Sequence, residues 1–374
     1  MRVLLDYRAA LRERSGVGEY THQLVAALLR RGRSNGRGPT LDLWLFSSSW
    51  KDRLALEPEI AGAHAVDRRV PVSVLNFAWH RLGWPPAELL AGGEFDVTHA
   101  LHPLILPSRH AAPVVSIHDL DFLRHPERTR AEIRRDYPSL VRDHAHRAKR
   151  IVTISEATAR GIVEMLGVPR DRIVVAQPGA PDWAPLPERP RDGYVLFLST
   201  LEPRKNVGAL LDAYELIGAR GLRPSVPPLV LAGKATEDAR PWLERIERPP
   251  LRGLVRHIGY VDPNRRREVY AGARLLVQPS FDEGFGMPVL EAMTLGIPVV
   301  AANRGALPEV LGDAGLLVDP ERPDEIADAI HRMVTDTALA EAGAARGRER
   351  ARAFTWDRTA AMVYDAYRHA CASA

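Results

Sequence analysis

The stretch LLVQPSFDEGFGMPVLEAMTL runs from Leu275 to Leu295 and contains the pattern on which the predicted fold rests. It opens with the apolar run Leu275–Gln278, which is typical of a strand buried on both faces of a parallel sheet. A polar loop with two glycines follows, and Pro288–Leu295 is then predicted to be a helix with proline in its first turn. A strand, a loop and a helix in this order form the repeating unit of α/β proteins.

The same alternation of strand and helix continues on both sides of this stretch. In the second half of the chain, apolar runs predict strands at Tyr194–Leu198, Leu229–Ala232, Val255–Ile258, Pro298–Ala301 and Gly315–Val318. Helical periodicity predicts helices at Asn206–Ile217, Pro263–Ala271 and Asp324–Thr335. In the first half, strands are predicted at Val3–Asp6, Leu41–Phe46, Asp96–Ala100, Val114–Ile117 and Ile151–Ile154, and a helix at Ser155–Leu166 with Ser155 as its N-cap. Each half is therefore predicted to be a doubly wound α/β domain.

The length of the chain also predicts two domains. Single cores stop growing at about 250–300 residues, and this chain has 374. The proline-rich segment Gln177–Pro190 lacks periodicity and is predicted to be the linker. We therefore assign residues 1–185 to a first domain and residues 186–356 to a second. In such sheets ligands bind outside the carboxyl ends of the strands, so we expect the two domains to face each other across a cleft.

The composition is that of an ordinary globular protein, with 45% hydrophobic and 26% charged residues. The single cysteine, Cys371, excludes an intramolecular disulfide framework. No apolar run approaches the about 20 residues that a membrane span requires. Met1 and Arg2 lead directly into the first strand without the pattern of a signal peptide. We therefore expect a cytoplasmic protein.

The charge is unevenly distributed along the chain. Up to Asp182 there are 26 basic and 21 acidic residues, whereas the remainder has 25 and 26. This excess is too small for a nucleic-acid-binding protein but suits a surface near acidic lipid or an anionic substrate. The most basic tract, Arg124–Arg150, contains nine Arg or Lys and four Glu or Asp. Its alternative interpretation is a solvated helix face.

The first candidate site follows the predicted strand Leu275–Gln278. The glycines of the loop allow a ligand to approach the backbone closely, and the start of the next helix offers free N–H groups to anions and hydroxyls. Glu283 lies in the loop and Glu291 about one turn inside the helix, so the two carboxylates suit the two ends of an elongated ligand. The alternative is a tight turn in which Glu291 interacts with the helix dipole.

The second candidate site follows the predicted strand Tyr194–Leu198. Arg204 and Lys205 precede a helix start, and Asn206 is a natural N-cap. Two cations beside a helix N-terminus are typical of a diphosphate site. Lys205 is one of only four lysines in a chain rich in arginine, so composition does not readily explain it. The alternative is a solvated charge pair.

Two weaker candidates lie in the first half. His118 follows the predicted strand Val114–Ile117 at the end that would face a ligand, although a lone histidine there is more often structural. The loop Ser15–Gly18 could bring backbone amides to a phosphate, but Thr21 stands where a dinucleotide site would have its third glycine.

Together these four features resemble glycosyltransferase family 4, whose members are retaining enzymes of the GT-B fold. The resemblance rests on Glu283 and Glu291 with Gly-Phe-Gly between them, the block Glu202–Asn206, the early Gly-Val-Gly loop and His118, and it extends along essentially the whole chain. The stretch Ile117–Glu127 looks most like bacterial mannosyltransferases that assemble surface polysaccharides.

The resemblance implies roles for the donor side. Arg204 and Lys205 would hold the nucleotide diphosphate and stabilise the charge that develops as it leaves. Glu291 would bind the ribose hydroxyls and Glu283 the donor sugar. The amides of Gly284, Phe285, Gly286 and Met287 would contact sugar and phosphate, and Tyr260 would lie near the base.

The resemblance also implies roles for the first domain. Gly16, with Gly18, would approach the diphosphate, and His118 would lie beside the transferred sugar. The last helix, at about 357–372, would pack back on the first domain.

A reaction without metal or other cofactor agrees with these residues. Arg204, Lys205 and the helix dipole can offset diphosphate charge, each such contact contributing on the order of 1–3 kcal/mol. Asp119 and Asp121 are the only site-like pair for a metal, and we expect them not to hold one. No base is evident, which fits attack on the face from which the diphosphate leaves.

We therefore predict a retaining hexosyltransferase that uses GDP-mannose and a glycan or lipid-linked acceptor, with a possible site of action at the membrane surface. A UDP-sugar is the alternative donor. An epimerase acting on a sugar nucleotide, or a protein that binds the nucleotide sugar without catalysis, is the alternative from another class.

Overall fold

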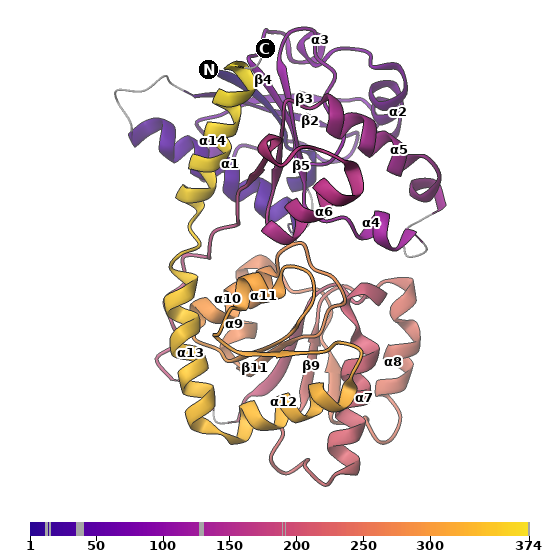
Figure 1. Ribbon diagram of the computed structural model, residues 1–374, viewed down its shortest axis with the longest axis vertical. Helices are drawn as coiled ribbons and strands as arrows, with labels where there is room; N and C mark the ends of the chain where they lie inside the picture. Colours follow the sequence, from indigo (N-terminus) through magenta and orange to yellow (C-terminus); the bar gives the residue numbers. More distant parts are fainter. Residues whose placement is uncertain are drawn as a thin grey trace. The chain divides into compact units, whose positions relative to one another are not determined.

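The protein is described by a computed structural model that covers residues 1–11, 14, 16–34, 41–126, 131–188, 190 and 192–372. The chain forms two compact units (Figure 1). The first consists of Met1–Gly179 together with Thr355–Ala374, and the second of Ala180–Phe354.

Both boundaries between the units differ from the predicted ones. The predicted first domain ends at residue 185, but the segment from Ala180 onward already belongs to the second unit. Its backbone is held there, because the N–H of Ala180 donates to the carbonyl of Phe354 and the N–H of Leu186 to that of Leu295. Trp356, predicted to end the second domain, instead begins the last helix of the first unit.

The first unit is built on a parallel sheet. Within the described residues its strand order is β3-β2-β1-β4-β5-β6-β7. The strands are β1 (Arg2–Asp6), β2 (Asp42–Ser48), β3 (His64–Arg68), β4 (Val97–Ala100), β5 (Ala112–Ile117), β6 (Arg150–Thr153) and β7 (Ile173–Val175). Residues on the inner strands are buried on both sides, as the continuous apolar runs predict.

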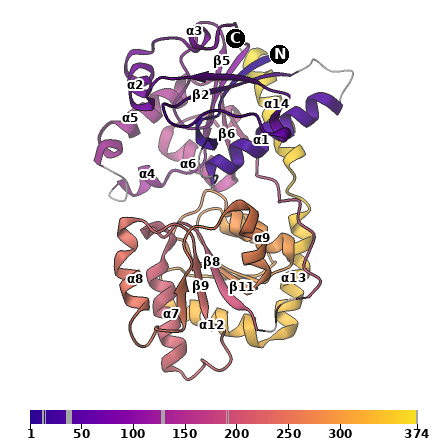
Figure 2. The same cartoon turned by 180° about the vertical axis from the view of Figure 1, so that it is seen from behind.

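Helices cover both faces of this sheet. One face carries α1 (Val17–Ser34) and α14 (Trp356–Ala372), which are packed together with apolar residues of β1 and β4. The other face carries α2 (Val72–Phe77), the π-helical turn η3 (Ala78–Leu82), α3 (Ala87–Ala91), α5 (Ala131–Arg147) and α6 (Glu156–Leu166). Figure 2 shows the two groups of helices on opposite sides. Shorter elements are α4 (Asp121–Arg124) and the turns η1 (Arg8–Ala10), η2 (Pro58–Ile60) and η5 (Arg170–Arg172).

The second unit repeats the architecture with the strand order β10-β9-β8-β11-β12-β13 in the described residues. Its strands are β8 (Tyr194–Leu198), β9 (Leu229–Ala232), β10 (Val255–His257), β11 (Ala273–Gln278), β12 (Val299–Ala302) and β13 (Leu316–Val318). Its helices are α7 (Val207–Ala219), α8 (Arg240–Ile246), α9 (Pro263–Ala271), α10 (Met287–Leu295), α11 (Leu307–Leu311), α12 (Pro323–Thr335) and α13 (Thr337–Ala351), with the turns η6 (Pro203–Lys205) and η7 (Glu237–Ala239).

The predicted elements are present, and two of the elements that were not predicted, β3 and α13, have weak sequence patterns. Ser155 caps α6, since its side chain accepts a hydrogen bond from the N–H of Thr158. The missed strand β3 lies at the sheet edge with the polar sequence HAVDR. The missed helix α13 is rich in alanine, glycine and arginine, so its buried face lacks large apolar residues.

A buried hydrogen-bond chain fastens α14 to the first sheet. The Nδ1 of His99, in β4, lies 2.7 Å from the hydroxyl of Tyr367 in α14, and its Nε2 lies 2.9 Å from the hydroxyl of Ser116 in β5. Burial, together with the nearby imidazoles of His118 and His102, lowers the pKa of His99 from 6.5 to about 3. The ring is therefore neutral in the folded protein near pH 7.

This depressed pKa predicts a loss of stability in acid. Below about pH 6.5 the unfolded chain binds a proton at His99, whereas the folded chain does not. The free energy of unfolding therefore decreases as the pH falls toward the pKa of the folded state. Glutamine can bond both hydroxyls but does not titrate. We expect the unfolding temperature of His99→Gln to decrease less than that of the wild type when the pH is lowered from about 7 to about 4.5. The control is His369→Gln, which replaces an exposed histidine of α14. Equal decreases of the unfolding temperature in all three proteins would refute the assignment.

Candidate functional site

The second unit brings two loops together at the point where its strand order reverses. β8 and β11 are hydrogen-bonded neighbours, with Leu196 opposite Leu276, although they are far apart in the sequence. Their carboxyl ends therefore lie side by side, and the loops that follow them carry Arg204 and Lys205 on one side and Glu283 on the other. This reversal point is where open α/β sheets bind ligands.

Lys205 and Glu283 form a buried ion pair. The Nζ of Lys205 lies 2.8 Å from Oε1 and 2.7 Å from Oε2 of Glu283. The two residues are only 7% and 8% exposed, so both charges are removed from water. Each charge thus depends on the other for its compensation.

Neighbouring side chains hold Glu283 in its charged form. The side-chain amide of Gln278 and the hydroxyl of Ser280 both donate to Oε1, at 3.0 Å and 2.8 Å. Burial alone would raise the pKa of Glu283, but the charges of Lys205 and Arg204 outweigh it and lower the pKa to about 2. Gln278 and Ser280 were not predicted from the sequence, because a polar residue at a strand end or in a loop does not reveal its contact there.

Arg204 joins the same cluster. Its Nη1 donates to the carbonyl of Asp282 at 3.0 Å and lies 3.6 Å from Oε2 of Glu283. Its Nη2 donates to Glu202 at 3.1 Å. The predicted pair of cations is therefore present at the start of α7, but it is embedded in carboxylates rather than solvated.

Asn206 occupies the N-cap position of α7 but does not cap the helix with its side chain as predicted. The residue adopts a left-handed conformation, with φ of 57°. Its amide instead donates to the carbonyls of Pro279 and Pro320, at 3.0 Å and 2.7 Å. Because Pro320 follows β13, Asn206 ties together the loops after three strands.

The glycine-rich loop leads directly into α10. Gly286 adopts φ of 106°, and a Cβ there would lie 2.6 Å from the side chain of Leu307. Phe285 is buried and packs its ring on Phe354, with centroids 5.7 Å apart.

Met287 is the first helical residue, one position before the predicted start, and Gly284 precedes Phe285 in the loop. The backbone of Glu283 also packs against Gly305, where a Cβ would lie 2.7 Å from its nitrogen.

Glu291 lies inside α10 and is buried, with 3% exposure. Its Oε2 accepts a hydrogen bond from the hydroxyl of Tyr270 at 2.7 Å and lies 3.1 Å from the Nε of Arg266. Both partners come from α9, and neither was predicted from the sequence to belong to the site. Tyr260, the last predicted donor-side residue, follows the edge strand β10 and is 39% exposed.

In the first unit, Gly16 and Gly18 lie at the start of α1, while Ser15 is outside the described residues. Gly16 has φ of 53° and immediately precedes the helix. Gly18 lies within the first turn rather than in a loop as predicted, and a Cβ there would lie 2.6 Å from the carbonyl oxygen of Ala9. Its lack of a side chain therefore lets α1 pack closely against η1.

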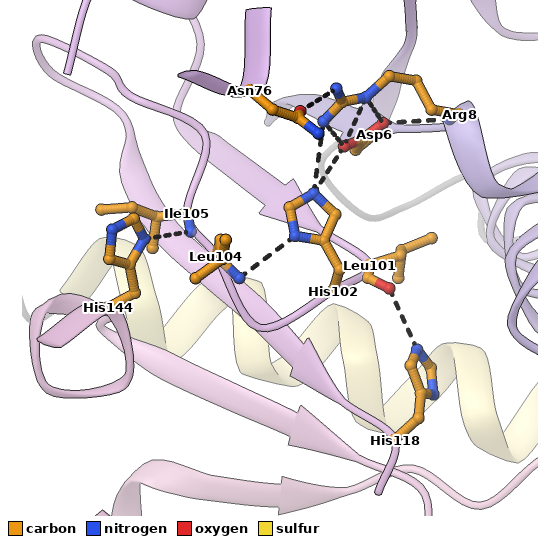
Figure 3. Close-up of polar contacts among 9 residues, drawn as sticks. All are labelled: Asp6, Arg8, Asn76, Leu101, His102, Leu104, Ile105, His118 and His144. Carbon is orange, nitrogen blue, oxygen red and sulfur yellow. Dashed lines mark hydrogen bonds and ion pairs between the residues drawn. The ribbon is translucent and has the colours of Figure 1, made fainter. Parts of the chain in front are cut away.

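His118 follows β5 and is neutral. Its Nε2 lies 3.3 Å from the carbonyl oxygen of Leu101, as Figure 3 shows. Its ring meets the ring of Tyr20 edge to face, with centroids 5.1 Å apart. Burial lowers the pKa of His118 to about 4, so at neutral pH the imidazole can form hydrogen bonds but carries no charge.

A second buried charged cluster, not predicted from the sequence, lies at the reversal point of the first sheet (Figure 3). Asp6, at the end of β1, binds Arg8 through both of its oxygens and accepts from the Nε2 of His102 at 3.0 Å. The Nδ1 of His102 accepts from the N–H of Leu104, so the proton of this ring is on Nε2. Burial would raise the pKa of Asp6, but Arg8 and His102 lower it far below its usual range.

The described residues contain one group with the spacing of metal ligands, formed by His22, Glu57 and Glu59. The Nδ1 of His22 is 2.7 Å from the hydroxyl of Tyr7, and Glu57 is paired with Arg14. The positive charge of Arg14 opposes a cation there. Asp119 and Asp121, the predicted site-like pair, do not form part of this group.

Comparison with known proteins identifies the class of this chain. Residues 14–182 match Glycosyltransferase Family 4, and residues 192–336 match the family Glycosyl transferases group 1. The chain is 35% identical over 276 residues to O-antigen chain mannosyltransferase B of Escherichia coli, covering 70% of this chain and 72% of that one. It is 32% identical to a D-inositol 3-phosphate glycosyltransferase of Rhodococcus opacus, covering 59% and 53% of the two chains.

Solved structures share the fold at low sequence identity. Sucrose-phosphate synthase from Thermosynechococcus elongatus has a TM-score of 0.79 at 19% identity, with both chains covered completely. The Anabaena protein HepE, solved with UDP and glucose, has a TM-score of 0.70 at 18% identity, covering 97% and 98%. The chain therefore belongs to glycosyltransferase family 4, and it is a glycosyltransferase with the GT-B fold.

The Lys205–Glu283 pair makes a prediction about stability. Lys205→Met leaves the buried carboxylate of Glu283 without its main partner, which costs on the order of 3 kcal/mol even though Arg204 remains. Replacing both residues, as Lys205→Met with Glu283→Gln, removes the unpaired charge, so we expect this double variant to be more stable than Lys205→Met. Thermal and denaturant unfolding measure the difference. The exposed Lys234→Met is the control, expected to change stability by less than about 0.5 kcal/mol. A double variant less stable than Lys205→Met would contradict the coupling.

Proposed function

We propose that this glycosyltransferase moves mannose from GDP-mannose to a glycan or lipid-linked acceptor, with retention of configuration and without a metal ion. The observation that carries the proposal is the cluster of Arg204, Lys205 and Glu283 at the reversal point of the second sheet. Similarity to the O-antigen mannosyltransferase supports mannose as the sugar.

The cluster suits a donor with a charged and a hydroxylated end. Of the three N–H groups of the Lys205 ammonium, two are directed at Glu283, which leaves one for a phosphate oxygen. Together with Arg204 and the N–H groups at the starts of α7 and α10, it would stabilise the developing negative charge of the departing diphosphate. These cationic groups are the reason for proposing that no metal is required.

Glu283 would orient the sugar. Its Oε1 accepts hydrogen bonds from Lys205, Gln278 and Ser280. Its Oε2 accepts one from Lys205 and so has capacity for a sugar hydroxyl. A carboxylate with a pKa of about 2 is an acceptor only and would not serve as a general base near pH 7. The proton of the acceptor hydroxyl would therefore pass to the departing phosphate, which requires attack on the same face and gives retention.

Glu291 would bind the ribose. Its hydrogen bond from Tyr270 and its pairing with Arg266 fix the carboxylate in one orientation inside α10. In the first unit, Gly16, Gly18 and His118 would contact the donor through N–H groups and a neutral imidazole.

The membrane part of the proposal concerns the lipid-linked acceptor. No helix in the described part of the chain combines the length and the apolar character needed to cross a bilayer. Part of the basic tract Arg124–Arg150 lies outside the described residues. Within it, Arg142 donates to the carbonyl of Met165 and Arg147 pairs with Asp143, so these two cations already have partners on the protein.

The identity of the nucleotide can be tested by thermal unfolding. A ligand that binds only the folded state raises the unfolding temperature according to its affinity. We expect GDP and GDP-mannose to raise it more than UDP, ADP and their sugars at equal concentrations. Arg204→Ala should reduce the shift, while Arg240→Ala, an exposed residue of α8, should preserve it. A larger shift with UDP or UDP-glucose would replace the proposed donor with the alternative one.

The role of Glu283 can be tested by turnover in a buffer containing EDTA. Glu283→Gln removes the charge but keeps the shape, and we expect transfer to fall by about 100-fold or more while GDP binding persists. Glu202→Gln, which removes the other carboxylate bound to Arg204, should keep most of the activity. Normal turnover of Glu283→Gln would exclude the role, and a wild-type enzyme inactive in EDTA would exclude the metal-free reaction.

A further inference from the structure

The segment Val72–Leu89 of the first unit exposes an apolar surface. Its exposed large apolar side chains are Val72, Val74, Phe77, Leu82, Trp84 and Leu89. They make up half of the large apolar side chains that are exposed among the described residues, although the segment is a small part of the chain. Single exposed apolar residues are normal, whereas a group of six within one short segment points to an interaction site.

The exposure does not result from a loosely held segment. Leu75 and Trp79 are each only 2% exposed and belong to the core under β1 and β2. The indole N–H of Trp79 donates to the carbonyl of Pro85 at 2.9 Å, and the guanidinium of Arg8 lies 5.2 Å from the centre of its ring. One side of α2 and η3 is therefore fixed in the core, while Phe77 and Leu82 are 63% and 67% exposed.

The charged side chains from Arg69 to Ala87 are all basic. From Arg69 to Ala87 the sequence contains no Asp or Glu, and both Arg69 and Arg81 are exposed. Glu88, the first acidic residue after them, accepts from the hydroxyl of Ser108 and the N–H of Arg109, whose side chain is also exposed. Aromatic and aliphatic side chains beside arginines match a bilayer with anionic headgroups, because the rings enter the interface and the cations attract phosphate.

We propose that Val72–Leu89 is the surface through which the first unit docks on an anionic phospholipid bilayer. The surface does not include the basic tract Arg124–Arg150. It is monotopic in character, since α2 and η3 are short and their inner side is committed to the core.

The position of this surface connects it to the sheet end of the first unit. Asn76 of α2 accepts a hydrogen bond from Nη1 of Arg8 at 2.8 Å, and Arg8 in turn binds Asp6 (Figure 3). The docking surface therefore adjoins the carboxyl ends of β1 and β4, where open α/β sheets bind ligands. A bilayer on Val72–Leu89 brings lipid headgroups close to this end of the sheet. That consequence, but not the docking itself, rests on the proposed lipid-linked acceptor.

The test is sedimentation of the full-length protein with phospholipid vesicles, without nucleotide or acceptor. We expect the wild type to bind vesicles of equal parts phosphatidylcholine and phosphatidylglycerol, and to bind pure phosphatidylcholine more weakly. Phe77→Ser combined with Trp84→Ser should lower the affinity for the mixed vesicles at least about tenfold, because each ring loses its burial in the interface. Met362→Ser, an exposed apolar residue on α14 across the sheet, is the matched control and should bind like the wild type.

Several outcomes would overturn the proposal. A wild type that fails to bind mixed vesicles excludes the docking surface, as does a double variant that binds as tightly as the wild type. A dimer in solution that the double variant converts to a monomer would show that the surface joins two copies of the chain instead. A second variant, Leu82→Ser with Leu89→Ser, gives an independent measurement on the same surface, and the unfolding temperature of each variant checks its fold.

Binding of GDP by the same samples separates this proposal from the proposed function. Lost vesicle binding with unchanged GDP binding concerns the docking surface alone. Absent GDP binding with normal vesicle binding contradicts the donor assignment and leaves the docking surface intact.

Discussion

The parallel pairing of β8 with β11 is the constraint on which the candidate site depends. The pairing places the loop after Leu198 beside the loop after Gln278, and only there can the ammonium of Lys205 reach the carboxylate of Glu283. Neither charge could be buried alone, because desolvation of an unpaired ion costs several kcal/mol. The pair therefore holds the two loops together, and Asn206 adds the loop after β13 through its bond to Pro320. These contacts join the loops that follow β8, β11 and β13.

The first unit meets the same constraint in a different way. β1 pairs with β4 at the corresponding reversal of strand order, and Asp6 is buried at that point with Arg8 and His102. Both sheets thus place a buried carboxylate with a lowered pKa at the position where such sheets bind ligands. In the first unit, however, the ion pair extends outward through Asn76 to α2. The contacts of Asp6, Arg8 and Asn76 thus connect the end of the first sheet to α2 at the surface of the unit. The described contacts between Lys205 and Glu283 make no such connection.

The histidines of the first unit contribute less to its positive charge than their number indicates. Ten of the 13 histidines precede Asp182. Burial lowers the pKa of His99 to about 3 and the pKa values of His80, His118 and His144 to about 4. These rings are neutral near pH 7, and those of His99, His118 and His144 form hydrogen bonds, as when His144 accepts from the N–H of Ile105. These four histidines therefore add no positive charge to the first unit near pH 7.

The local pattern determined much of this protein. Continuous apolar runs such as Leu229–Ala232 identified the inner strands, because a strand buried on both faces must be apolar throughout. The family resemblance rested on four motifs in order along the chain, which are the Gly-Val-Gly loop, His118, the block Glu202–Asn206, and Glu283 with Glu291. The sequence did not reveal that Lys205 binds Glu283, that Tyr270 and Arg266 hold Glu291, or that Asn206 bonds across loops instead of capping its helix. Those contacts join residues that are distant in the chain and adjacent only after the strands have paired. Strand order depends on the packing of the whole sheet, so it, and with it the partners of every buried charge, was decided by the tertiary structure.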